Sequence, residues 1–234
     1  MKKVILNIII VILICTLFYS GYHIVVWYLD NKKTDNLITD VKDEVKKEDS
    51  KTNNITYDFN KLKSINDETV AWINIPNTNV DYPIVKHKDN SFYLNHSFDK
   101  SHNISGWLFM DYRNNNDFTD KNTIIYAHGM LNGTMFGSLR NLLKLDDLKN
   151  TSINIYTEKG LIEYKIFSIY KIPTTDDYLK ISFENNEFTN FIDLIGPRSE
   201  KYLDETVNEK DTILTLSTCY DETEKLVIHA KKNN

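Results

Sequence analysis

The first hydrophobic pattern is a continuous apolar run. Residues 4–29 are almost all apolar, with Asn7, Ser20 and His23 as the main exceptions, and the run is long enough to cross a bilayer. Lysines precede it, and no small-residue cleavage site follows it. We therefore predict a single transmembrane anchor over residues 4–29, with residues 1–3 in the cytoplasm and the rest of the chain outside. A cleaved signal peptide is the alternative.

Beyond the apolar run the pattern becomes polar. Residues 30–57 are mostly polar and charged, yet Leu37, Val41 and Val45 recur at helical spacing. This pattern predicts a polar linker that is partly helical.

From residue 58 onward the pattern is typical of a globular domain, which we place at 58–234. Short β-branched and aromatic runs alternate with Asn, Asp and Gly clusters, as strands alternate with turns. The runs read GWLFMDY, NTIIYAH, SINIYT, LIEYKIFSIYKI, DTILTLSTC and KLVIHAK. Three segments instead have apolar residues three or four apart and predict helices: FNKLKSIN, MFGSLRNLLK and NEFTNFIDLI. We expect a mainly β (α+β) domain, a barrel with helices added.

Composition narrows the functional classes. The net charge of −5 argues against a nucleic-acid-binding surface. Three histidines, His87, His96 and His102, lie in one polar region, but their spacing is not that of a zinc site. We therefore expect no metal and no cofactor.

The two cysteines differ in setting. Cys15 lies within the apolar run and Cys219 near the C-terminus, so no disulfide is expected to join them. A lone thiol in an outer domain is either a buried apolar group or a reactive one. Alternation in TILTLSTC places Ser217 and Cys219 on one face of a strand. If residues 220–224 form a hairpin loop, Lys225 pairs with Cys219 and favours its thiolate. The alternative is that Lys225 merely extends into water.

A histidine is the second candidate for chemistry. His128 ends an apolar strand immediately before a glycine, a place where a rigid scaffold can aim a reactive group. The alternative is a histidine that only satisfies local hydrogen bonds. His229 is the competing partner, but in the hairpin register it lies roughly 13 Å along the strand from the position opposite Cys219.

Several stretches together resemble the sortase family, and most closely its class B members. They are TLSTC after an apolar strand, IIYAHGM upstream, WINIPNTNVDYPIV, DNSFYLNHSF, GWLFMDYRN and TTDDYLK. The resemblance runs from about residue 60 to the end of the chain. It implies an eight-stranded β-barrel with N-terminal helices and a helix before the seventh strand, near residues 184–195.

The resemblance also implies an activity. It predicts a membrane-anchored cysteine transpeptidase on the outer face of a Gram-positive-type cytoplasmic membrane. Such an enzyme cleaves the C-terminal sorting signal of a secreted protein after its threonine and holds the acyl group as a thioester. An amine of the peptidoglycan cross-bridge or of its lipid-linked precursor then takes the acyl group.

By the same resemblance, Cys219 matches the nucleophile and His128 the general acid/base. The residues that would line the peptide groove are Ser217, Asn90, Leu94, Thr174, Tyr178 and Leu179. For Tyr178 and Leu179, core packing is an equal alternative.

The sequence departs from the family at one position. Lys225 stands where sortases carry an arginine that stabilises the oxyanion and holds the substrate, and the loop from Cys219 is shorter than usual. Lysine supplies charge but lacks the planar fork of arginine. The alternatives are therefore a catalytically impaired sortase-like protein that binds peptides, or another extracytoplasmic cysteine peptidase. An L,D-transpeptidase is disfavoured, because its usual Ser-His-Gly-Cys stretch is absent.

Overall fold

The computed structural model describes residues 2–48, 55–145, 148, 151–201 and 203–233. The chain divides into two compact units, Met1–Asp40 and Val41–Asn234.

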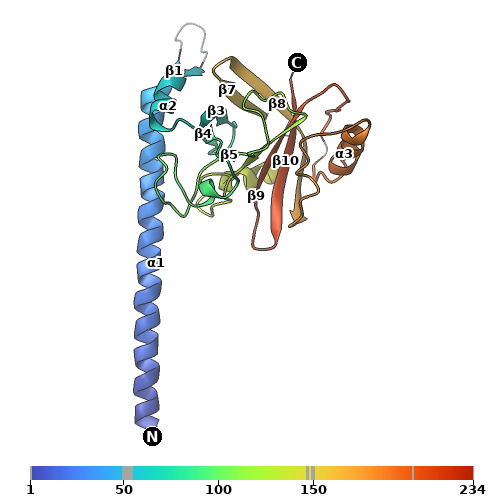
Figure 1. Ribbon diagram of the computed structural model, residues 1–234. Helices are drawn as coiled ribbons and strands as arrows, with labels where there is room; N and C mark the ends of the chain where they lie inside the picture. Colours follow the sequence, from blue (N-terminus) through green and yellow to red (C-terminus); the bar gives the residue numbers. More distant parts are fainter. Residues whose placement is uncertain (1, 49–54, 146–147, 149–150, 202, 234) are drawn as a thin grey trace. The chain divides into compact units, whose positions relative to one another are not determined.

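The first unit is made by one long helix. Helix α1 (Lys2–Val45) continues without a break through the apolar run and into the polar segment after it (Figure 1). Its apolar side chains, from Val4 to Leu29, are exposed. Within the described part of the chain, it is the one helix whose length and composition would let it cross a membrane.

The second unit begins before the domain boundary expected at residue 58. Val41 and Val45 are buried, and the Asp58 amide donates to the Val45 carbonyl at 2.9 Å. A short antiparallel pair, β1 (Lys46–Glu48) with β2 (Ile55–Tyr57), follows. The sequence did not predict this pair, because its residues are mostly polar and do not show a strand pattern. The last turns of α1 belong to the globular unit because their valines provide apolar surface to bury.

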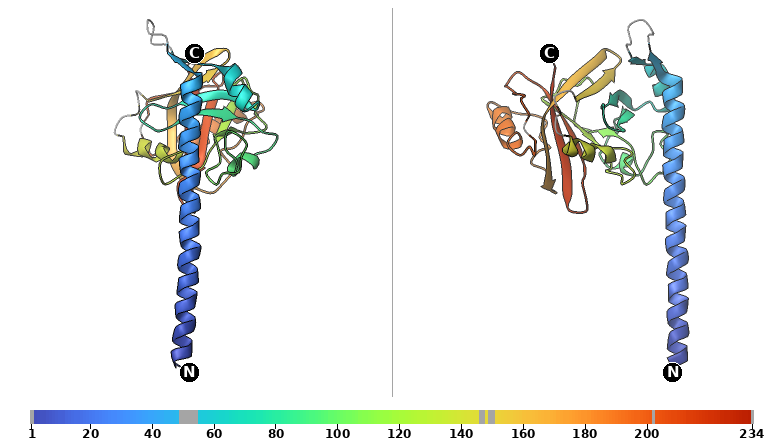
Figure 2. Two further views of the ribbon diagram at one scale, coloured as in Figure 1. Left: turned by 90° about the vertical axis from the view of Figure 1, so that its left-hand side faces the viewer. Right: turned by 180° about the vertical axis from the view of Figure 1, so that it is seen from behind.

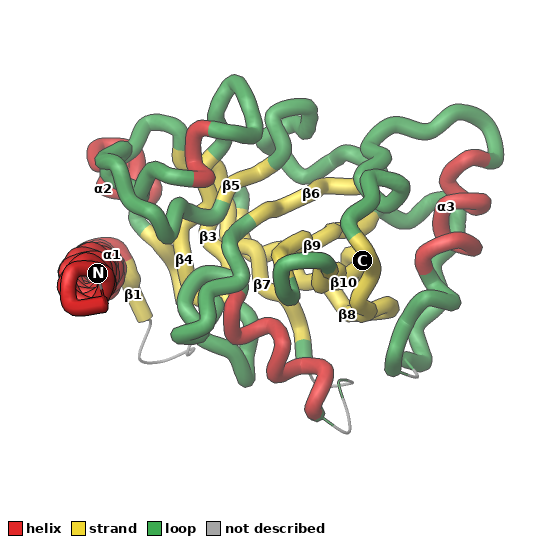
Figure 3. The backbone as a smooth tube through the Cα atoms, turned by 90° about the horizontal axis from the view of Figure 1, so that it is seen from below, coloured by secondary structure: helices red, strands yellow, loops and turns green. Residues whose placement is uncertain are grey.

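Eight strands close into a barrel in the order β10-β8-β7-β3-β4-β5-β6-β9 (Figure 3). Their bounds are β3 (Thr69–Asn74), β4 (Asp81–Val85), β5 (Phe109–Met110), β6 (Asn122–Tyr126), β7 (Ser152–Thr157), β8 (Gly160–Pro173), β9 (Ile213–Cys219) and β10 (Glu224–Lys232). Two neighbouring pairs, β4 with β5 and β6 with β9, are parallel, and the others are antiparallel. The expected eight-stranded barrel is confirmed.

Helical segments fill the connections. They are α2 (Phe59–Ile65), the 3-10 turn η1 (Phe92–Leu94), η2 (Gly137–Lys144) and α3 (Glu187–Ile195). Asp58 begins α2 by accepting the Lys61 amide at 3.2 Å. The segment expected as a helix near residue 140 is η2, a 3-10 helix rather than an α-helix. Figure 2 shows the barrel and its connections from two further sides.

Helix α3 is the helix expected before the seventh barrel strand, β9. It buries Phe188, Phe191 and Ile195 in an apolar cluster that also contains Tyr178 and Val227. The three residues recur at three and four positions apart, so one face of α3 packs on the barrel. This packing supports the segment between β8 and α3, which forms part of the site.

Candidate active site

The cysteine lies at the end of a central strand. Strand β9 is hydrogen-bonded to β6 on one side and β10 on the other, and it is buried from Ile213 to Thr218. Cys219 ends the strand and is exposed. The rigid, buried strand thus presents its terminal thiol to solvent.

The hairpin from β9 to β10 places a cation beside the thiol. Cys219 and Lys225 are paired across the two strands, as the expected loop over 220–224 requires. Lys225 Nζ lies 3.0 Å from Cys219 Sγ. The ammonium group thus lies within hydrogen-bonding distance of the sulfur. Lys225 therefore does not merely extend into water.

The histidine is brought to the cysteine by a parallel strand pair. Tyr126 of β6 is paired with Ser217 of β9. His128 and Cys219 each follow two residues later and line one pocket. The close approach explains Gly129, because a Cβ added there would lie 2.0 Å from the Cys219 carbonyl oxygen. Only glycine lets the two chain ends come this near.

A backbone carbonyl orients the imidazole. His128 Nε2 lies 2.7 Å from the Leu94 carbonyl oxygen. A carbonyl can only accept, so Nε2 carries the proton in this arrangement and Nδ1 is left for proton transfer. The hydrogen bond anticipated as an alternative for His128 therefore exists, and it is compatible with a catalytic role.

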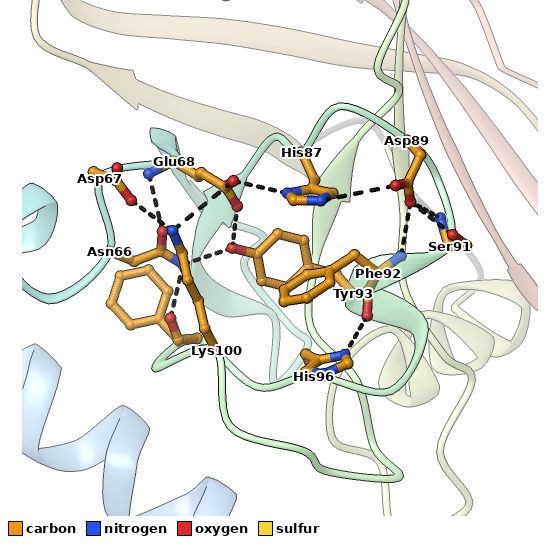
Figure 4. Close-up of polar contacts among 11 residues, drawn as sticks. Asn66, Asp67, Glu68, His87, Asp89, Ser91, Phe92, Tyr93, His96 and Lys100 are labelled. Atoms are coloured by element: carbon orange, nitrogen blue, oxygen red, sulfur yellow. Dashed lines mark hydrogen bonds and ion pairs between the residues drawn. The ribbon is translucent and has the colours of Figure 1, made fainter.

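The segment that carries this carbonyl is itself fixed by a polar network, drawn in Figure 4. Glu68 accepts the Tyr93 hydroxyl at 2.6 Å, and His87 Nδ1 lies 2.7 Å from the same carboxylate. Asn66 Nδ2 donates to the Tyr93 hydroxyl oxygen at 2.8 Å. Tyr93 belongs to η1, immediately before Leu94. The network thus ties η1 to the start of β3 and to the segment after β4.

Two of the histidines considered as metal ligands, His87 and His96, pack in the same region. The Phe92 ring stacks between those of His87, at 4.5 Å, and His96, at 4.0 Å. His96 Nδ1 lies 2.8 Å from the Phe92 carbonyl oxygen. Among the described residues, no group of His, Cys, Asp and Glu is arranged to hold a metal ion. These side chains pack and support η1.

A groove of about 740 Å³ opens beside the thiol. His128, Cys219 and Lys225 line this groove. Every residue that the sequence placed in the groove also lines it: Asn90, Leu94, Thr174, Tyr178, Leu179 and Ser217. Six further lining residues were not predicted from the sequence: Phe109, Tyr126, Ala127, Thr175, Asp176 and Thr218. Tyr126 lies two residues before His128, so strand alternation could have indicated it. Ala127 and Thr218 have the opposite parity, and alternation would have placed them on the other face.

Tyr178 serves both the core and the groove. Its ring is buried in the cluster under α3, while its hydroxyl lies 3.0 Å from Ser217 Oγ. Burial raises the pKa of this phenol, so it stays a neutral hydrogen-bonding group. Tyr178 therefore packs in the core and also lines the groove.

His229 lies apart from the thiol, as the strand register predicted. It is paired with Thr215 rather than with Cys219, and it is fully buried. Its ring nitrogens contact the Tyr170 hydroxyl at 2.9 Å and Thr215 Oγ1 at 2.8 Å. Burial lowers its pKa to about 3. His229 is a neutral core residue.

The chain is similar to known proteins over most of its length. A family model described as a sortase domain matches residues 73–233. Sortase B of Listeria monocytogenes is 36% identical over 88% of this chain and 85% of its own length. Sortase B of Staphylococcus aureus is 33% identical over 97% of this chain and 96% of its own.

Solved structures show the same similarity to class B sortases. A Bacillus anthracis protein described as similar to sortase B is 34% identical, with a TM-score of 0.75 over 88% of this chain and 96% of that one. Clostridium perfringens sortase B is 32% identical, with a TM-score of 0.71 over 76% of this chain and 100% of that one. With its closed barrel and its cysteine and histidine on one groove, the chain belongs to the sortase family, whose members are cysteine transpeptidases, and is most like the class B sortases.

Proposed function

We propose that this protein is a membrane-anchored transpeptidase that cleaves the C-terminal sorting signal of secreted proteins after a threonine and transfers the acyl group to a peptidoglycan amine. The observation that carries the proposal is the convergence of Cys219, His128 and Lys225 on one groove. By the family resemblance, Cys219 is the nucleophile and His128 the general acid/base.

The first half of the reaction forms a thioester. The Cys219 thiolate, held 3.0 Å from the Lys225 ammonium, attacks the carbonyl carbon of the threonine. The peptide C–N bond breaks, and protonated His128 gives a proton to the leaving amine. The acyl group is then bound to Sγ.

The second half resolves the thioester. An acceptor amine, whose proton His128 removes, attacks the same carbonyl carbon. The C–S bond breaks, an amide forms and Cys219 returns as thiolate. One solved sortase B, 34% identical with a TM-score of 0.69, is complexed with triglycine. That complex supports a glycine-type amine of the peptidoglycan cross-bridge, or its lipid-linked precursor, as the acceptor.

Lys225 takes the role of the family's arginine in this proposal. During attack, negative charge moves from the sulfur to the carbonyl oxygen, and a flexible ammonium group beside the sulfur can follow it. Lysine makes only point-charge contacts where arginine could make two parallel hydrogen bonds. We therefore expect catalysis that is weaker than with arginine but not lost.

The proposal also includes the substrate that the groove receives and the location of the protein. The groove residues Asn90, Leu94, Thr174, Leu179 and the Tyr178–Ser217 pair would receive the sorting peptide, whose carrier is a secreted protein. Helix α1 supports a single-pass anchor in the cytoplasmic membrane with the catalytic domain outside.

The test uses the full chain in detergent micelles with a panel of fluorogenic sorting peptides, with and without triglycine. We expect cleavage after threonine, and a ligated product when triglycine is present, and neither with Cys219→Ala. Hydrolysis with no ligation would instead indicate a cysteine peptidase. Peptide binding without cleavage would indicate a catalytically impaired relative.

A further inference from the structure

A buried carboxylate lies behind the groove. Asp111 directly follows β5, and its side chain is 0% exposed. Its Oδ2 accepts the Asn90 Nδ2 at 3.0 Å and the Tyr126 hydroxyl at 2.9 Å. Asn90 and Tyr126 both line the groove. Asp111 therefore links two groove residues that come from different segments of the chain.

Asp111 also reaches another part of the groove through an arginine. Arg113 donates from Nε to Oδ1 at 2.9 Å and from Nη2 to Oδ2 at 2.8 Å. The same Nη2 donates to the Leu179 carbonyl at 3.2 Å. Leu179 lies in the segment between β8 and α3. The Asp111–Arg113 pair thus connects the Asn90 and Tyr126 side of the groove with the Leu179 side.

The amide of Asn90 is held in one orientation by these contacts. Its Nδ2 is engaged by Asp111, and its Oδ1 accepts the Tyr112 amide at 3.0 Å. A side chain fixed at both amide atoms loses little further freedom when a peptide binds beside it. The benefit of this arrangement is therefore in peptide binding, not in the chemistry at sulfur.

The carboxylate is ionised despite its burial. Burial alone would raise the pKa of Asp111, but the hydrogen bonds from Arg113, Tyr126 and Asn90 outweigh it and leave that pKa below its usual value. A buried charge with such partners is costly to leave unmatched. The site is accordingly built for a carboxylate rather than an amide.

We propose that Asp111 is a positioning residue for the sorting peptide, which shapes the groove by fixing Asn90 and Tyr126 directly and Leu179 through Arg113. The inference rests on the proposed function. It goes beyond that function because Asp111 is itself outside the groove lining, and its side chain bonds to Asn90, Tyr126 and Arg113 rather than to Cys219, His128 or Lys225.

The experiment measures KM and kcat for sorting-peptide cleavage by the full chain in micelles. Asp111→Asn keeps the size of the side chain. Its single amide oxygen cannot accept the hydrogen bonds of Arg113, Asn90 and Tyr126 together. We expect KM to rise about tenfold, the equivalent of one or two such hydrogen bonds, with kcat within about twofold. The rate at which iodoacetamide alkylates Cys219, and its pH profile, should not change, because the thiol and its cation are untouched.

The matched control is Asp120→Asn. Asp120 also accepts from an asparagine amide, Asn114 Nδ2 at 2.9 Å, and from the Asn115 amide at 2.6 Å, but neither partner lines the groove. We expect its KM to equal that of the wild type. Equal KM changes in the two variants would overturn the proposal.

A second variant keeps the proposal testable if Asp111→Asn does not fold. The Arg113 side chain is 44% exposed, so Arg113→Gln is expected to fold, and it removes the Leu179 contact. Its KM should rise severalfold with normal alkylation. An unchanged KM in a folded variant would overturn the proposal while the wild type's cleavage upholds the transpeptidase function. A wild type that cleaves no sorting peptide would overturn both.

Discussion

Lys225 lies directly opposite Cys219 on the neighbouring strand, with its ammonium nitrogen 3.0 Å from the sulfur. The hairpin loop fixes this pairing, so the sulfur that we propose as the nucleophile has an ammonium group beside it. The resemblance to the sortase family predicts an arginine at this position, and this chain has a lysine there. Under the proposed function, this one side chain would contact first the sulfur and then the oxyanion.

The first prediction concerns Lys225. Replacing Lys225 with Ala removes the cation beside the sulfur, so the charge that develops on the carbonyl oxygen loses its partner and acyl transfer should collapse. Lys225→Arg should raise acyl transfer, because the guanidinium can engage two acceptors. No response of acyl transfer to either substitution would remove Lys225 from the oxyanion role.

The second prediction concerns Gly129. Its substitution by Ala puts a Cβ 2.0 Å from the Cys219 carbonyl oxygen, so β6 and β9 must separate where the two reactive residues meet. We expect kcat/KM to fall by more than about tenfold, since a small misplacement of catalytic groups is costly. Gly196→Ala is the control, with its nearest atom at 3.0 Å and no strand contact to the site. A normal kcat/KM for Gly129→Ala would show that the approach is not needed.

The third prediction concerns the network behind η1. Tyr93→Phe removes the hydroxyl that joins Asn66 to Glu68, so the Leu94 carbonyl that orients His128 should lose support. We expect kcat to fall about threefold, and the free energy of unfolding to fall by about 1–2 kcal/mol. Steady-state kinetics measure kcat, and urea denaturation measures the free energy of unfolding. Tyr156→Phe, on β7 and away from η1, should leave kcat unchanged. A stability loss without any change in kcat would limit the network to a structural role.

The fourth prediction is a pH dependence of stability. The pKa of His229 is lowered to about 3 by burial, whereas an unfolded histidine titrates near about 6.5. Between these values the unfolded chain binds a proton that the folded chain does not, so this residue makes stability fall as pH drops from about 6.5 toward 3. Urea denaturation midpoints measured across this pH range should show the fall in stability. His229→Gln should flatten the slope, and the exposed His102→Asn should not; equal slopes for wild type and His229→Gln would contradict the assignment.

Sequence patterns predicted the local features of the site. Alternation in β9 placed Ser217 and Cys219 on one face, and the loop over 220–224 set Lys225 opposite the thiol, because both depend on residues close together in the chain. The order of motifs also identified the family and the groove segments. The sequence did not reveal β1 and β2, the 3-10 form of η2, or the start of the globular unit at Val41, since their composition resembles that of a polar linker or an ordinary helix.

By itself, the sequence determined which side chains share a strand face, where helices form, and that Cys219 has a cation across its hairpin. Only the tertiary structure decided that His128 lies beside Cys219, about ninety residues later in the chain, and that Asp111 reaches Leu179 through Arg113. Periodicity states which face a residue occupies but not which distant strand becomes its neighbour. Closure of the barrel, with β6 and β9 parallel and in one register, is what turns separate motifs into a site.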